Sequence, residues 1–69
     1  MLQTEIMNSW EKELYKNEAD VIRHFMVGGL TDRRAADLLG IADFELNELY
    51  AIHRNKTAEE VAEILLSLS

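Results

Sequence analysis

Residues 31–53, TDRRAADLLGIADFELNELYAIH, have the pattern of two short helices joined by a tight turn. Ala36 falls where the two helices would cross, a position with room only for a small side chain. Gly40 falls in the turn, where glycine adopts a positive φ without steric cost. Apolar residues fill the positions that such a unit must bury: Ala35, Leu39, Ile41, Leu46 and Leu49. The pattern predicts a helix-turn-helix unit at residues 31–53.

Residues 2–27 form an N-terminal arm that we expect to be helical, as one continuous helix or as two. Apolar side chains at spacings of four predict a stripe on a first helix that spans about residues 3–16. The stripe consists of Leu2, Ile6, Trp10 and Leu14. Glu11 falls on the side of that helix that we expect to face solvent. Asn17 could cap a second helix that ends before two glycines, although no residue forces a break there.

Capping residues mark the starts of the remaining helices. Thr31 and Asp43 are placed to cap the two helices of the helix-turn-helix unit. Thr57, with Glu60 three residues later, forms a capping box that predicts a last helix over residues 58–68. The side chains of this helix that we expect in the core are Val61, Ile64, Leu65 and Leu68. We therefore predict an all-α fold, four to five short helices around a central helix-turn-helix, in a single domain over residues 1–69.

The chain has 69 residues and no cysteine, so it forms neither disulfides nor thiolate metal sites. A domain of this size without such cross-links is marginally stable alone, and we expect a homodimer formed through one terminal helix. The sequence has no run of about 18 apolar residues that could span a membrane. The N-terminal residues also lack the pattern of a signal peptide. A cytoplasmic protein with no membrane partner is therefore expected.

If the helix-turn-helix unit reads duplex DNA, the outward positions of its second helix enter the major groove. Those positions hold Asp43, Phe44, Asn47, Glu48 and Ala51, with Glu45 at the side. Asn47 could pair with adenine, and Glu48 could accept a hydrogen bond from cytosine. The cations placed to contact phosphates flank that helix: Arg33, Arg34, Arg54 and Lys56. This pattern predicts a small dimeric transcription regulator.

The charge of the same helix supports an alternative function. The net charge of −6 opposes attraction to nucleic acid, and no Lys or Arg lies between Phe44 and His53. An exposed Phe44 could instead anchor a protein partner. In this alternative the protein is an adaptor or inhibitor that binds a basic partner, or that occupies the partner's nucleic-acid site as a mimic of DNA. The partner-binding residues would be Phe44, Glu45, Glu48 and Ala51.

No group of residues in the sequence indicates catalysis, a metal site or a cofactor. His24 and His53 are far apart in the sequence and lack the neighbouring ligands of a metal site. Gly28 and Gly29 lack the lysine and the strand of a phosphate-binding loop. We therefore expect a binding protein rather than an enzyme.

Residues 28–50, GGLTDRRAADLLGIADFELNELY, combine a short glycine-containing turn, an Ala-Ala pair and an aromatic-Glu-Leu segment. The residues that carry this combination are Leu30, Ala35, Ala36, Gly40, Ile41, Phe44 and Leu46. Through them, residues 22–55 resemble a family of small prokaryotic proteins that are predicted to be helix-turn-helix antitoxins. The resemblance implies a dimer that binds an operator and captures a partner protein, such as a toxin, through a short terminal segment.

Overall fold

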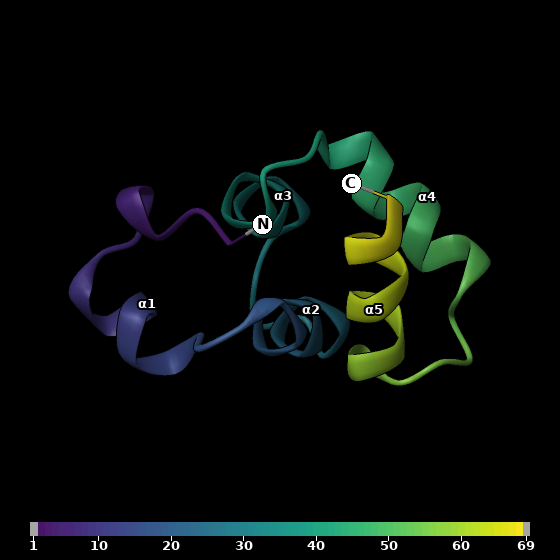
Figure 1. Ribbon diagram of the computed structural model, residues 1–69, viewed down its shortest axis with the longest axis horizontal. Helices are drawn as coiled ribbons and strands as arrows, with labels where there is room; N and C mark the ends of the chain where they lie inside the picture. Colours follow the sequence, from purple (N-terminus) through teal and green to yellow (C-terminus); the bar gives the residue numbers. More distant parts are fainter. Residues whose placement is uncertain (1, 69) are drawn as a thin grey trace.

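The computed structural model of the protein describes residues 2–68, and within that range it contains helices and turns but no strand. Its elements are a short 3-10 helix, η1 (Thr4–Ile6), and the helices α1 (Ser9–Leu14), α2 (Glu18–Met26), α3 (Asp32–Leu39), α4 (Asp43–Ile52) and α5 (Ala58–Leu68). The predicted all-α fold is therefore confirmed. Figure 1 shows α1 at one end of the molecule and α4 with α5 at the other, with α2 and α3 between them.

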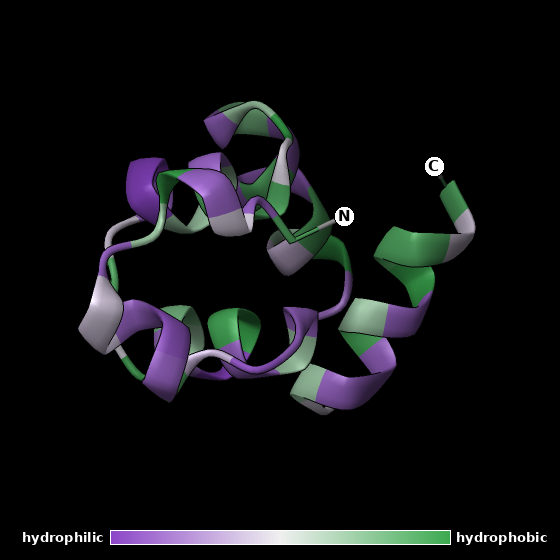
Figure 2. Ribbon diagram, turned by 60° about the vertical axis from the view of Figure 1, so that its left-hand side comes forward, coloured by the Kyte–Doolittle hydropathy of each residue, from purple (hydrophilic) through white to green (hydrophobic). Residues whose placement is uncertain are grey.

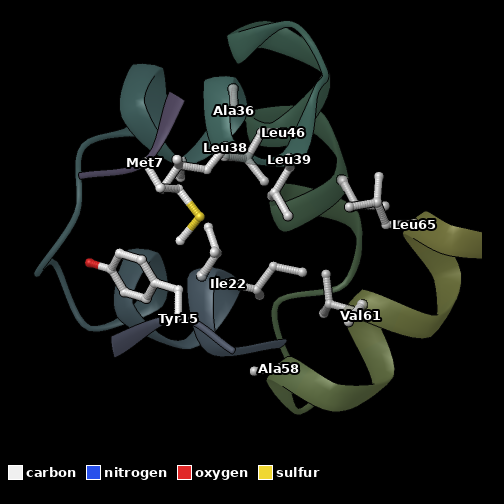
Figure 3. Close-up of a cluster of buried hydrophobic side chains, with 14 residues drawn as sticks. Met7, Tyr15, Ile22, Ala36, Leu38, Leu39, Leu46, Ala58, Val61 and Leu65 are labelled. Carbon is white, nitrogen blue, oxygen red and sulfur yellow. The ribbon is translucent and has the colours of Figure 1, made fainter. Parts of the chain in front are cut away.

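The core lies between α2 and the three helices that follow it. α2 packs on both α3 and α5, and α3 packs on α4. The largest apolar side chains that are fully buried are Val21, Ile22, Leu38, Leu39, Leu46 and Val61 (Figure 3). Met7 and Tyr15 join this cluster from the N-terminal arm. Removal of one such side chain from water stabilises the fold by about 1.5–3 kcal/mol.

Helices α3 and α4 pack against each other, and Gly40 lies in the turn between them. Thr31 caps α3, because its Oγ1 accepts a hydrogen bond from the backbone N–H of Arg34 at 3.1 Å. Gly40 ends α3 with a φ of 72°, a conformation that favours glycine. A Cβ at Gly40 would also displace the amide of Gln3, whose Nε2 would lie 2.7 Å away. Ala36 is 1% exposed, as expected at a crossing. Of the other positions predicted to be buried, Ala35, Leu39, Leu46 and Leu49 are buried and Ile41 is half-buried.

The N-terminal arm differs from the prediction, because neither a continuous helix nor a first helix over residues 3–16 forms. The backbone is extended at Met7, with a ψ of 137°, and again at Tyr15, with a ψ of 95°. Between these breaks, α1 begins where the Glu11 carboxylate accepts the backbone N–H of Asn8 at 3.1 Å. Asn17 caps α2 as predicted, since its Oδ1 accepts the N–H of Asp20 at 3.0 Å.

The buried side of the arm is also not the predicted apolar stripe. The exposed fractions of the stripe residues Ile6, Trp10 and Leu14 are 44%, 56% and 45%. The side chains that turn toward the rest of the protein are those of Met7, Glu11 and Tyr15, each one position later in the sequence. Glu11, which we expected in solvent, is 1% exposed, because a cation from α3 pairs with it across the fold.

The start of α4 lies one residue earlier than predicted. α4 begins at Asp43, so Ala42 rather than Asp43 is its N-cap residue. Alanine has no side-chain acceptor, and the Glu45 carboxylate instead satisfies this end of the helix by accepting the Ala42 N–H at 2.9 Å. Asp43 is therefore a half-buried residue of the first turn and does not cap the helix.

Helix α5 begins as predicted, and it buries Val61 and Leu65 of the predicted set but leaves Ile64 half-buried. Thr57 and Glu60 form the expected capping box, with hydrogen bonds of 2.9 and 3.2 Å between each backbone N–H and the other side chain. The core residues of α5 are Ala58, Val61, Ala62 and Leu65. Leu68, predicted to be buried, is 73% exposed, because α5 packs mainly on α2 and its last turn is left uncovered. Figure 2 shows this hydrophobic end of α5 at the edge of the molecule.

Candidate functional site

A groove of about 520 Å³ lies between α4 and α5. It is lined by Ile41, Phe44, Glu45, Glu48, Leu49, Ile52, His53, Ile64, Leu65 and Leu68. The groove exists because α5 packs closely on α2 and makes few contacts with α4. Figure 1 shows its two walls, α4 and α5, at the end of the molecule opposite to α1.

Three large apolar side chains of the groove are mostly exposed. Phe44 is 68% exposed and Ile52 is 66% exposed, and both lie on α4. Phe44, Glu48 and Ile52 follow one another at intervals of four residues, so they share the outward face of α4. Leu68, which is 73% exposed, continues the apolar surface on α5. An exposed apolar surface of this kind is typical of a binding site for a protein.

The charged residues of the groove are acidic. Glu45 and Glu48 both line it, whereas no Lys or Arg of residues 2–68 does so. His53 lies at the end of α4 and is the only other titratable side chain of this lining. The surface therefore combines apolar anchors with a negative rim.

Of the cations predicted to contact phosphates, Arg34 has a structural partner. Its Nε donates to Oε2 of Glu11 at 2.9 Å, and its Nη2 donates to Oε1 of Glu11 at 2.6 Å. The same Nη2 donates to the backbone carbonyl of Ile6 at 2.9 Å. The hydrogen bond from Arg34 holds the pKa of the Glu11 carboxyl below its ordinary value, although burial opposes this effect. Arg34 thus fastens the N-terminal arm to α3, a role that sequence reasoning missed.

Asn47, the residue predicted to pair with adenine, links the two helices of the unit. Its Nδ2 donates to Oδ2 of Asp32, in the first turn of α3, at 2.9 Å. This hydrogen bond, with that from the backbone N–H of Arg33, lowers the pKa of the Asp32 carboxyl. A base contact by Asn47 would have to replace or share this bond.

The other predicted DNA-binding cations lie outside the groove. Arg33 is exposed in the first turn of α3, and Arg54 is exposed in the turn that follows α4. Lys56 is half-buried in the same turn and contributes to the lowered pKa of Glu60, which is due mainly to Thr57. The structure therefore brings the predicted acidic and aromatic residues together on α4 and leaves these cations beside it.

Residues 2–68 contain neither a candidate metal site nor a membrane-spanning helix. This part of the chain holds no cluster of three or more His, Cys, Asp or Glu residues that could bind a metal ion. Its helices are all too short or too polar to cross a membrane.

Comparisons of the chain with protein-family models, with curated proteins and with solved structures found no match. The resemblance of residues 22–55 to helix-turn-helix antitoxins therefore stays a prediction.

Proposed function

We propose that the protein is a protein-binding adaptor or inhibitor, built on a helix-turn-helix scaffold, that binds a basic partner through the outward face of α4. The observation that carries this proposal is the exposure of Phe44 and Ile52 at the two ends of that face. Residues of α5 extend the same apolar surface. Burial of each side chain by a partner would contribute about 1.5–3 kcal/mol, enough to form the centre of an interface.

The charge of α4 favours a basic protein over DNA. Asp43, Glu45 and Glu48 lie on this helix, which contains no Lys or Arg. Affinity for duplex DNA comes largely from cations that neutralise phosphates, and carboxylates that face phosphates weaken it. The same carboxylates would instead attract a basic surface and increase its association rate.

The experiment compares two matched substitutions of exposed aliphatic residues. Ile52→Ser removes an anchor of the groove, whereas Val27→Ser changes a side chain that is 77% exposed outside it. Each variant is immobilised and incubated with extract of the source organism, and the retained proteins are purified and tested again alone. A direct partner should bind the wild type and Val27→Ser equally. It should bind Ile52→Ser about 10- to 150-fold more weakly, the equivalent of about 1.5–3 kcal/mol.

The proposal would be wrong if no purified protein distinguishes Ile52→Ser from Val27→Ser. Neither side chain belongs to the core, so both variants should fold. Circular dichroism checks that their helices are retained.

A second candidate function, operator binding by a transcription regulator, is favoured by the α3–turn–α4 geometry around Ala36 and Gly40. Because Arg34 is paired with Glu11, phosphate contacts would come from the cations Arg33, Arg54 and Lys56. In that case DNA affinity should fall steeply with salt, and each cation replaced by Ala should reduce the slope by about one unit.

A further inference from the structure

We infer that the groove between α4 and α5 receives an amphipathic, basic α-helix of the partner protein. This inference rests on the proposed function and specifies the chemistry and the secondary structure of the segment that binds.

The walls of the groove suit a helix. Both walls are helices, and the part of the chain that the structure describes offers no strand edge to which an extended peptide could be added. A helix can pack between two others through ridges and grooves on their surfaces. α4 has 10 residues and α5 has 11, so each wall is about 15 Å long, the length of about three helical turns.

The anchors have a matching spacing. Phe44 and Ile52 are eight residues apart on α4, a rise of about 12 Å. Apolar residues at positions i, i+3 or i+4, and i+7 of a partner helix span about 10 Å, so the outer two reach both anchors. Leu68 contributes the opposite wall of the groove. A segment of two to three turns with one apolar stripe therefore fills the groove.

The charge of the groove selects Lys and Arg beside that stripe. Glu45 and Glu48 lie in the lining between the two anchors, and no Lys or Arg among residues 2–68 lines the groove to neutralise them. A second copy of this chain would bring a further net charge of −6, and duplex DNA would bring phosphates. Both are repelled by the rim, whereas a basic helix gains electrostatic complementarity.

The test uses the full chain and three labelled peptides of equal length. The first is amphipathic, with a stripe of Leu and Ile and flanking Lys and Arg. The second keeps the stripe but has flanking Glu, and the third has the composition of the first in an order that destroys the stripe. Fluorescence anisotropy should show that the first peptide binds at least about tenfold more tightly than either of the others.

A pair of charge reversals locates the binding site. Glu48→Lys changes the rim of the groove, and Glu13→Lys makes the same change in net charge at an exposed position of α1, outside the groove. Glu48→Lys should weaken binding of the basic amphipathic peptide and strengthen binding of the acidic one. Glu13→Lys should do neither, because Glu13 lies outside the groove. Since both variants have the same net charge, it controls for the effect of overall charge.

Equal binding of the basic amphipathic and scrambled peptides would overturn the inference, because it would show attraction to charge without a groove. Equal effects of Glu48→Lys and Glu13→Lys would do the same. So would sedimentation in which the wild type self-associates and Ile52→Ser does not, which would assign the groove to a second copy. If the peptides fail while a purified partner still depends on Ile52, the inference falls and the proposed function stands. If that dependence on Ile52 is also absent, the proposed function falls with it.

Discussion

Replacement of Arg34 by Met should test how the N-terminal arm is held. Methionine has a long side chain and a good helix propensity but leaves the carboxylate of Glu11, whose side chain is 2% exposed, without its cation. Loss of one partner of a buried ion pair costs about 3–5 kcal/mol. Arg34 is 34% exposed, so water screens part of the interaction, and we expect a loss at the lower end, about 3 kcal/mol.

A loss of this size is large for so small a domain. At about 0.05–0.15 kcal/mol per residue, the whole chain has a free energy of unfolding of about 3.5–10 kcal/mol. Each kcal/mol lowers the Tm by about 4–8 °C at this size, so Arg34→Met should melt about 12–24 °C below the wild type. Adding Glu11→Leu should recover much of the loss, because it removes the unpaired carboxylate.

The ion pair also predicts a dependence on pH. The pKa of the Glu11 carboxyl is lowered in the folded protein from an ordinary value of 4.5, so the unfolded chain binds the proton more readily. The pair therefore contributes its full stability above about pH 4.5, and the contribution is lost as the pH falls through the folded pKa. The difference in stability between the wild type and Arg34→Met should be constant near neutral pH and should shrink in acid.

Urea and thermal denaturation, followed by circular dichroism, measure these differences. A loss below about 1 kcal/mol for Arg34→Met, the size of an ordinary surface ion pair, would refute the structural role assigned to Arg34. A difference in stability that grows as the pH falls below 4.5 would refute the sign of the linkage.

Four further predictions concern stability and association. Ala36→Leu should overpack the crossing of α3 and α4 and cost about 1–3 kcal/mol in urea denaturation, and an unchanged midpoint would contradict this. Gly40→Ala should cost about 1–2 kcal/mol, because the residue must keep a positive φ; equal stability would show that the turn can relax. Leu65→Ala should cost about 2–5 kcal/mol, whereas Leu68→Ala, in the exposed last turn, should change stability by less than about 0.5 kcal/mol; similar losses would place both in the core. We also expect a homodimer through the N-terminal arm at high micromolar concentration, weakened by Trp10→Ser, and sedimentation of the wild type as a monomer would contradict it.

The central and C-terminal helices could be predicted because their signals are local. Thr31 and Thr57 cap helices through hydrogen bonds to residues three positions away. Gly40 is required where the backbone adopts a positive φ. The arm could not be predicted in the same way. Its form depends on the pairing of Glu11 with Arg34, which lies 23 residues further along the chain. Periodicity assigned Glu11 to solvent because a sequence pattern shows which residues share a face but not what that face meets.

The part of the candidate site that lies on α4 could be predicted, because its signals are local. The exposure of Phe44 followed from its outward position in the helix-turn-helix register, and the acidic rim could be read directly from Glu45 and Glu48. The second wall of the groove could not be foreseen, because the pattern of α5 placed Leu68 with the core residues. Only the packing of α5 on α2 shows that its last turn stays uncovered.

The most direct test is an NMR titration that follows the amide chemical shifts of the labelled protein. It is made with the basic amphipathic peptide and, separately, with duplex DNA at low salt. We predict that the peptide shifts the amides of residues 44–53 and 64–68, and that DNA causes no saturable change at about 100 μM, a concentration at which ordinary non-specific binding is detectable. Saturable shifts with DNA at residues 33–34 and 44–56, together with none from the peptide in the groove, would contradict the proposal that the outward face of α4 binds protein.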